Sequence, residues 1–472
     1  MGAGVRRGNR SGFHYGWIIV FMGMVASMGA HGFGRMAYTL ILPEMCEGLG
    51  ITYTQAGLLG TGNFIGYLAF ALIGGFLAAR YGSRIVISLS LFLMGVTMVL
   101  TGMAQSFELA FVLRLLTGIG NGGAYVPAMA LGSTWFAMKR RGFATGIVSG
   151  GTGAGTFISG LLVPAILIAY AGRGWSYAWY YLGVLVLIIA AICAIFLRNK
   201  PADLGLGLVG SEPGGTALDA AAGADRDADA DSGAGSEAGA DAGEEGGAGG
   251  VGYGATGAEN AAGPGAGVKK PGSMQWSLVY RLKEVWYLGF VYFLYGFSYV
   301  IYMTFFKAFL VDEIGLTGAK ASALWAMVGV LSIFCGIIWG GISDLLGRRY
   351  GAALAYFALA CSYLIFAHFD SIVAIYLSAI LFGLSAWSIP TIMAATAGDY
   401  VGPLLAPAGV GFVTLFFGIG QAFGPALGGY IGDTWGTFTL AFSMAALISL
   451  AGAGAALFLK KPAAESSVKA GA

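Results

Sequence analysis

Long apolar stretches separated by short polar turns run through most of the chain. A helix of about 20 apolar residues is long enough to cross a bilayer, and the pattern predicts six such spans, a long polar break and six more. The expected spans are 15–43, 53–79, 85–104, 107–136, 142–170 and 175–197, then 284–311, 319–343, 349–368, 371–396, 407–432 and 436–459. The predicted fold class is an all-α polytopic membrane protein.

The amino-acid composition is also that of a membrane protein, and its change along the chain separates three regions. Hydrophobic residues make up 57% of the sequence and charged residues 10%, whereas soluble domains are about a quarter charged. The break is rich in Gly, Ala, Asp and Glu and cannot bury enough apolar surface to fold. We therefore expect a six-helix half over 1–200, a disordered acidic linker over 201–272, and a second six-helix half over 273–472.

Charges in the turns predict the orientation. One set of turns and tails is basic, and it comprises Arg6, Arg7, Arg10, Arg80, Arg84, Lys139, Arg140, Arg141, Arg198, Lys200, Lys269, Lys270, Arg348, Arg349, Lys460 and Lys461. The opposite set is mainly acidic, with Glu44, Glu47, Glu108, Asp312, Glu313, Asp370 and Asp433. Because Lys and Arg are retained in cytoplasmic loops, we expect a multi-pass protein of the cell membrane with both termini in the cytoplasm.

The two halves repeat each other. The turn Gly75–Arg84 of the first half matches Gly340–Arg349 of the second, and the upstream turns at Gly50 and Gly315 align at the same offset without a gap. A parallel repeat of two six-helix halves is how one class of secondary transporter is built, with its substrate site near the membrane midplane between them.

These motifs carry a family resemblance. The matched turns are similar to the G-x-L-A-D-R-x-G-R-R motif of the major facilitator superfamily; the second copy keeps the acid as Asp344, whereas Ala79 replaces it in the first. The fourth span resembles that superfamily's arginine motif, with Arg114, Gly118 and Gly120. The resemblance implies twelve transmembrane helices, transport by alternating access, and an asymmetric cytoplasmic charge latch that holds the outward-open state. The expected gating residues are Asp344, Arg348, Arg349, Arg80 and Arg84.

A narrower resemblance concerns the substrate. The Gly-Phe-Gly-Arg-x-Ala-Tyr-Thr-x-x-Leu-Pro pattern over 32–43, with Trp175 and Trp179 before the sixth span, is similar to the prokaryotic monocarboxylate and oxalate–formate porter branch. This resemblance implies small organic anions as substrates.

The charges inside the spans also indicate an anionic substrate. His31, Arg35, Arg114 and Lys307 are placed inside spans, and no Asp or Glu falls deep within any of them. Positive groups at that depth favour an anionic ligand, and a guanidinium can bind a carboxylate through paired hydrogen bonds. We therefore expect Arg35 and Arg114 to bind the substrate carboxylate. The alternative for Arg114 is that it anchors backbone carbonyls at a helix seam. For Lys307, near the outer end of its helix, we expect an extension to the lipid headgroups.

The first span carries the polar face on which we expect the chemistry. Ser27, His31, Arg35 and Tyr38 are spaced four, four and three apart, which in an α-helix places them on one face. His31 is the deep side chain whose ordinary pKa is near neutral, so we expect it to carry a coupled proton. The alternative is a neutral histidine hydrogen-bonded in the core.

Other candidates line the expected cavity. On the seventh span, Tyr292, Tyr295, Tyr299 and Tyr302 form a stripe of rings with hydroxyls, which either lines the pocket or packs against neighbouring helices. The expected substrate-binding residues besides the two arginines are Tyr38, Asn121, Tyr125, Tyr295, Tyr299, Tyr302, Trp387 and Gln421. Weaker candidates are Asn63, Tyr67, Trp325 and Thr391.

The sequence therefore predicts a monomeric secondary transporter of a small organic anion, most simply a monocarboxylate taken up by proton symport. The alternatives are an anion exchanger, an exporter of drugs or hydrophobic compounds with the same fold, and a membrane receptor that signals through the linker. The sequence has no catalytic triad, nucleotide-binding loop or metal-ligand cluster, so we expect no enzyme activity, cofactor, metal or nucleic-acid partner.

Overall fold

The computed structural model describes residues 14–210, 279, 281–401 and 405–460. The described residues belong to one compact unit, made of Met1–Ser211 and Trp276–Ala472. Eleven helices in these ranges are long and apolar enough to cross a membrane, and the twelfth span is the bent pair Tyr53–Ala71 and Ile73–Tyr81. The predicted all-α membrane fold is confirmed.

In the described part of the chain, the first half consists of eight helical segments and one short turn. They are α1 Gly16–Ser27, the π-helix η1 Met28–Met36, α2 Tyr38–Leu49, α3 Tyr53–Tyr81, α4 Ser83–Thr101, α5 Phe107–Trp135, α6 Met138–Ala169, α7 Gly174–Phe196 and the 3₁₀ turn η2 Pro201–Leu204. Helices α1, η1 and α2 together form the first span, Gly16–Leu49.

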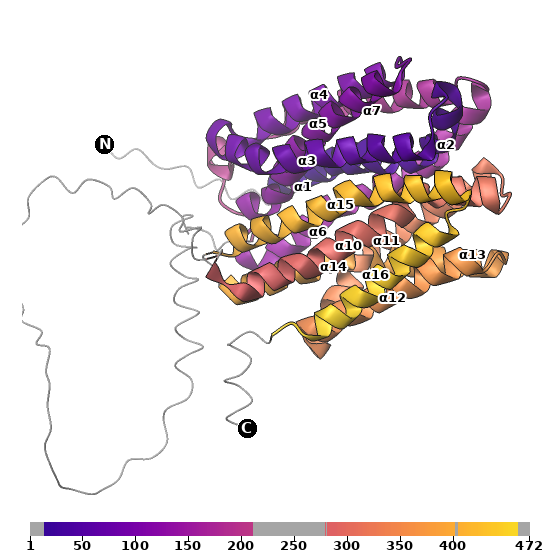
Figure 1. The fold of residues 1–472 in the computed structure, drawn as a ribbon. Helices are drawn as coiled ribbons and strands as arrows, with labels where there is room; N and C mark the ends of the chain where they lie inside the picture. Colours follow the sequence, from indigo (N-terminus) through magenta and orange to yellow (C-terminus); the bar gives the residue numbers. More distant parts are fainter. Residues whose placement is uncertain (1–13, 211–278, 280, 402–404, 461–472) are drawn as a thin grey trace, which may run out of the picture. The chain divides into compact units, whose positions relative to one another are not determined.

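The second half repeats this plan. Its helices are α10 Lys283–Ala308, the π-helix η3 Phe309–Glu313, α11 Gly318–Leu346, α12 Arg348–His368, α13 Ile372–Ser385, α14 Ser388–Val401, α15 Ala406–Trp435 and α16 Thr439–Leu457. Figure 1 shows α1–α7 (indigo to magenta) on one side and α10–α16 (orange to yellow) on the other, with α3 next to α15 where the halves meet.

Matching glycines support the internal repeat. Gly82 and Gly347, in the two turns that share the motif, have φ of 93° and 92°, and the aligned Gly50 and Gly315 have φ of 63° and 73°. Glycine adopts positive φ without the steric cost that other residues incur. The two halves thus make the same two turns with the same backbone conformation.

The tenth span differs from its prediction as one continuous helix. It is divided into α13 and α14 around Ala386. Pro390 has no N–H to donate to the carbonyl oxygen of Ala386, four residues earlier, and the hydroxyl of Tyr295 donates to that oxygen instead. The break therefore follows from a proline inside the apolar run.

The beginning of the expected linker belongs to the helical unit. Val209 is buried and pairs with the turn between α5 and α6: its N–H donates to Trp135 O at 2.9 Å, and Ala137 N–H donates to Val209 O at 3.0 Å. The remainder of the expected linker, 211–272, lies outside the described residues.

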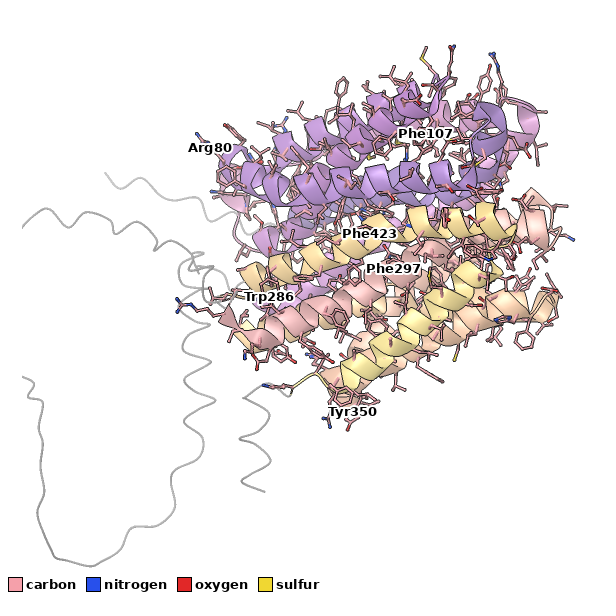
Figure 2. All side chains as sticks on the ribbon, viewed as in Figure 1. Arg80, Phe107, Trp286, Phe297, Tyr350 and Phe423 are labelled. Atoms are coloured by element: carbon pink, nitrogen blue, oxygen red, sulfur yellow. The ribbon has the colours of Figure 1, made fainter. Side chains whose placement is uncertain are left out.

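The two ends of the helical body differ in charge. We call the end with Arg80, Arg84 and Arg348 the basic end and the end with Glu44 and Asp433 the acidic end. Figure 2 labels Arg80 at the basic end, with Phe107 toward the other end.

The halves meet closely toward the acidic end. The N–H groups of Tyr53 and Thr54, which begin α3, donate to the carboxylate of Asp433 on α15 at 2.9 and 2.6 Å. Thr61 on α3 donates to Ala422 O on α15 at 2.6 Å. A Cβ added to Gly57 would lie 2.1 Å from Pro425 O, so the two backbones are in contact.

The same helix faces separate toward the basic end. Gly75 and Gly411 continue the contacting faces of α3 and α15 by helical spacing, and a Cβ added to either would meet no described atom within 4 Å. The same holds for Gly146 on α6 and Gly340 on α11, although nearer the acidic end Gly160 of α6 touches Ala326 of α11. Among the described residues, the halves are therefore closed at the acidic end and apart at the basic end.

Candidate functional site

A change of helix type in the first span places its polar residues. Between α1 and α2 the chain forms the nine-residue π-helix η1, in which Ala37 N–H donates to Gly32 O, five residues earlier, at 3.1 Å. π-helical segments are rare and often occur at functional sites. His31 and Arg35 both lie in η1, with 6% and 5% of their surfaces exposed.

Arg35 links the two halves. Its Nη1 donates to His31 Nε2 at 3.3 Å, and its Nη2 donates to the hydroxyl of Tyr299 on α10 at 2.7 Å. The same hydroxyl accepts a hydrogen bond from Nε2 of Gln421 on α15. We call His31, Arg35, Tyr299 and Gln421 the central polar site.

Aromatic rings surround this site. The Arg35 guanidinium carbon lies 4.3 Å from the ring centroid of Phe64 and 5.5 Å from that of Tyr67, both on α3. The His31 ring lies 3.6 Å from the Tyr125 ring, centroid to centroid. Cation–π contacts stabilise a guanidinium by about 0.5–2 kcal/mol, but they leave its charge unneutralised. Within the described ranges, no carboxylate forms an ion pair with Arg35.

Three buried polar atoms of the site have no protein partner. They are Arg35 Nε, His31 Nδ1 and Gln421 Oε1. A buried polar group without a hydrogen bond costs about 1–3 kcal/mol, and more when it is charged. A ligand carboxylate that accepts from Arg35 Nε would recover part of that cost, so the site is suited to an anion.

Tyr38 does not share the face of His31 and Arg35, and the prediction that it does was wrong. Its hydroxyl donates to Ala56 O on α3 at 2.7 Å, and its ring lies beneath Arg114, 4.5 Å from the guanidinium carbon. The prediction assumed α-helical spacing, whereas the wider turns of η1 change which residues lie above one another.

Arg114 and Asn121 both face η1 from α5. Arg114 Nη1 donates to Gly34 O and Asn121 Nδ2 donates to Ala30 O, each at 3.0 Å. The Arg114 guanidinium carbon also lies 5.0 Å from the ring of Trp179 on α7. These contacts are all within the first half and agree with the anchoring alternative for Arg114.

The four tyrosines of the stripe on α10 make different contacts. Tyr292, Tyr295 and Tyr299 are stacked nearly parallel with Phe417 of α15, at interplanar angles of 8–15° and centroid distances of 4.5–6.0 Å. Tyr302 instead points into the second half, where its hydroxyl lies 2.8 Å from Ser378 Oγ. Tyr299 is the member of the stripe that contacts Arg35.

Trp387 lies at the break between α13 and α14. Its ring is 6.0 Å from that of Phe382, centroid to centroid, and it is partly buried. This contact is within the second half. Of the expected substrate-binding residues, the structure thus brings Arg35, Tyr299 and Gln421 together, and the Tyr125 ring packs beside them against His31.

Lys307 is completely buried and paired, so the expectation that it extends to the headgroups was wrong. Its Nζ donates to Glu44 Oε1 at 2.5 Å and to Leu40 O at 2.6 Å, and both partners belong to α2 of the opposite half. Glu44, which the sequence placed in a turn, instead belongs to the first span, because its last helix continues through Pro43 to Leu49.

Residues of the expected latch lie at the basic end. Arg348 Nε donates to Asp399 Oδ2 on α14 at 3.3 Å, and Arg349 Nη2 donates to the Tyr350 hydroxyl at 2.6 Å. The side chain of Asp344 lies outside the described residues.

The corresponding turn of the first half has no acid, and its arginines make other contacts. Arg84 Nε donates to Ala194 O of α7 at 2.7 Å, and the Arg80 guanidinium lies 5.5 Å from the Tyr81 ring. A latch that holds a different conformation stays a prediction.

Sequence reasoning missed two rings of the site and the acid that pairs with Lys307. The Phe64 ring lies under the Arg35 guanidinium and the Phe417 ring stacks with Tyr299. A phenylalanine in an apolar span resembles any lipid-facing residue in the sequence. Glu44 was assigned to a turn because the expected first span ended at residue 43, whereas α2 continues to Leu49.

Comparison with known proteins establishes the family. The model of the Major Facilitator Superfamily matches residues 24–403 and 288–472. The chain belongs to this superfamily. It is 26% identical over 442 residues to the probable sulfoacetate transporter SauU of Cupriavidus necator, covering 90% of this chain and 89% of that protein. It is 24% identical over 423 residues to the hexuronate transporter of Bacillus subtilis, covering 87% of each.

A solved structure agrees with the fold. A bacterial homologue of the human lysosomal transporter Spinster superposes with a TM-score of 0.65 at 15% identity, covering 95% of each chain. At that identity the similarity concerns the fold, which is the superfamily's twelve helices in two six-helix halves.

Proposed function

We propose that this member of the major facilitator superfamily is a secondary transporter of a small organic anion, in the simplest case a monocarboxylate, and that Arg35 binds its carboxylate. The observation that carries the proposal is a buried guanidinium between the two halves, paired with no described carboxylate and with an unpartnered Nε. The names of relatives support an anion: sulfoacetate and hexuronate are both anionic.

The hydrogen bonds of Arg35 suggest how binding is coupled to movement. Arg35 belongs to the first half, whereas Tyr299 and Gln421 belong to the second. An anion held by all three stabilises conformations in which the halves approach each other around it. Differential binding of this kind is what shifts a two-state equilibrium, as alternating access requires.

His31 provides a route for proton coupling. Because an arginine N–H can only donate, His31 Nε2 accepts from Arg35 Nη1 and is unprotonated in this arrangement. A proton at that nitrogen turns the pair into two donors, between which a carboxylate fits. Proton and anion then each favour binding of the other, and such coupling is reciprocal.

The orientation follows from the charges. With the basic end in the cytoplasm, the conformation described here, closed at the acidic end, is inward-facing. The protein would then reside in the cell membrane with both termini on the cytoplasmic side.

A matched pair of tyrosine variants tests the binding site. Tyr299→Phe removes the hydroxyl that Arg35 and Gln421 contact, whereas Tyr295→Phe removes one that donates to Ala386 O within its own half. We expect Tyr299→Phe to weaken anion binding about tenfold, since a hydrogen bond to a charged group contributes about 1.5–3 kcal/mol, and Tyr295→Phe to leave it unchanged.

The measurement is a thermal-shift titration of the purified protein with a panel of organic acids, because a ligand of the folded state raises its apparent stability. Equal weakening in both variants would remove Tyr299 from the site. Stabilisation by organic cations and by no anion would instead support the exporter of hydrophobic compounds.

Proteoliposomes distinguish symport from exchange. We expect an inward proton gradient to drive accumulation of the anion, and His31→Gln to abolish that accumulation while anion-for-anion exchange continues. The control is wild-type protein with equal pH on both sides. Exchange that is fast in wild type and indifferent to the gradient would identify an anion exchanger.

A further inference from the structure

We propose that Arg114 and Asn121 are positioning residues, which hold the π-helix η1 in the form that presents His31 and Arg35 to the substrate. The inference rests on the proposed function of Arg35. It differs from the sequence-based expectation, in which both α5 residues bind the anion themselves.

Arg114 and Asn121 donate hydrogen bonds to the carbonyl groups that directly precede the site residues His31 and Arg35. Asn121 donates to the carbonyl oxygen of Ala30, and Arg114 donates to that of Gly34. These carbonyls belong to the peptide units that join Ala30 to His31 and Gly34 to Arg35. Because a peptide unit is planar, fixing its oxygen fixes the direction in which the next residue begins.

The residues of α5 that contact η1 are regularly spaced along one face of α5. Arg114 and Asn121 are seven residues apart on α5, which places them on one face two turns apart. Tyr125, one further turn along that face, packs its ring against the His31 ring, with 3.6 Å between the centroids. One face of α5 thus contacts η1 at two carbonyls and one site side chain.

The described contacts of Arg114 and Asn121 all lie within the first half, while Arg114 Nε and Asn121 Oδ1 have no protein partner. Their exposed fractions are 1% and 0%. The guanidinium of Arg114 lies against the rings of Tyr38 and Trp179, and the carbonyl of Arg114 accepts from Asn63 Nδ2 at 3.1 Å. Both bonds from α5 reach η1 without contacting the second half, to which an anion between the halves must bind.

A second helix confines η1 at a position between the two braced carbonyls. A Cβ added to Gly32 would lie 2.5 Å from Gly155 Cα of α6, and one added to Gly155 would lie 2.7 Å from Gly32 Cα. This backbone contact limits sideways movement of η1, and the two donors of α5 orient its peptide units. Together they determine where Arg35 points.

The test compares Asn121→Leu with Thr117→Val on the same helix. Thr117 is also completely buried, but its hydroxyl donates to Leu113 O within α5 and lies 3.0 Å from Thr97 Oγ1. Each change removes one buried hydrogen-bonding group of α5. Affinity for an anion that stabilises wild type is measured by titration, together with the melting temperature without anion and the KM and maximal rate of uptake in proteoliposomes.

We expect Asn121→Leu to weaken binding and raise KM about tenfold, while Thr117→Val, with a comparable loss of melting temperature, keeps wild-type affinity. Arg114→Lys, which retains one donor for Gly34 O, should keep binding within about threefold. Wild-type affinity in Asn121→Leu would overturn the proposal, because it would make Asn121 merely structural. Loss of binding in Arg114→Lys at an unchanged melting temperature would also overturn it, because Arg114 would then contact the anion.

The proposed function is tested separately in the same titrations. If Arg35→Gln binds the anion as wild type does, the role of Arg35 is wrong, whatever the α5 variants show. If Arg35→Gln loses binding and Asn121→Leu does not, the function stands and the positioning role fails.

Discussion

Replacing Arg35 with glutamine is expected to abolish anion binding and uptake while leaving the protein at least as stable as wild type. Glutamine carries no charge and cannot form the bidentate, charge-assisted hydrogen bonds by which arginine binds a carboxylate. Two charge-assisted hydrogen bonds contribute about 1.5–3 kcal/mol each, so we expect affinity to fall at least about 100-fold, at about 1.4 kcal/mol per tenfold change.

Stability should change in the opposite direction. The Arg35 charge is buried among the rings of Phe64 and Tyr67, and none of the described carboxylates pairs with it. An unpaired buried charge is costly, so its removal should keep or raise the melting temperature in detergent. The control is Arg35→Lys, which keeps the positive charge but lacks the paired N–H donors of a guanidinium. We expect its affinity for the anion to be intermediate. A stable Arg35→Gln variant that still transports would contradict the proposed function.

Breaking the ion pair between Lys307 and Glu44 is expected to have the second large effect, on the closed acidic end. The three ammonium protons of Lys307 need acceptors, and its two described acceptors, Glu44 and Leu40 O, both lie in the opposite half. Opening of the acidic end would separate Lys307 from both. The pair therefore stabilises the conformation in which that end is closed.

The two single variants should differ in cost. Glu44→Ala leaves a completely buried ammonium without its counter-ion, whereas Lys307→Met leaves a carboxylate whose side chain is 34% exposed and can be hydrated. Removal of one partner of a buried pair costs about 3–5 kcal/mol. We expect about 3 kcal/mol for Glu44→Ala, about 1 kcal/mol for Lys307→Met, and a smaller loss for the double variant Glu44→Gln with Lys307→Met, in which no charge stays unpaired.

Cys46 provides a reporter within the native sequence. It is buried in α2, two residues from Glu44. With the other three cysteines, Cys193, Cys335 and Cys361, changed to serine, maleimide should modify Cys46 about tenfold faster in Glu44→Ala than in wild type. Equal rates in both would show that the ion pair does not control closure, and melting temperatures would confirm that the variants are folded.

Much of the fold could be predicted because a membrane limits the alternatives. A spanning segment must satisfy its backbone internally, so an apolar run of sufficient length forms a helix. The predicted span 107–136 and the observed α5, Phe107–Trp135, differ by one residue, and the repeat inferred from Gly82 and Gly347 reappears as matched backbone angles. The break in the tenth span was also readable in principle, because Pro390 leaves a carbonyl without its donor.

The candidate site was predictable in its central residue and not in its arrangement. The depth and charge of Arg35 marked it as a candidate, and the structure places it against Tyr299, which was found as part of a stripe. The spacing of the tyrosines in the sequence does not indicate which of them faces the other half. Tyr295, one turn away, instead donates to Ala386 O exposed by the break in the tenth span.

Hydropathy, the internal repeat and the charges are properties of the chain read in order, and from them a twelve-helix membrane protein of two repeated halves with positive charge buried inside could be predicted. The π-helical form of η1, the donation of Arg114 and Asn121 to its carbonyls, and the neutralisation of Lys307 by Glu44 emerge from the packing of the helices. Those features depend on which helix packs beside which, and at which register, and contacts between residues 80 or 263 positions apart leave no periodic signal in either segment.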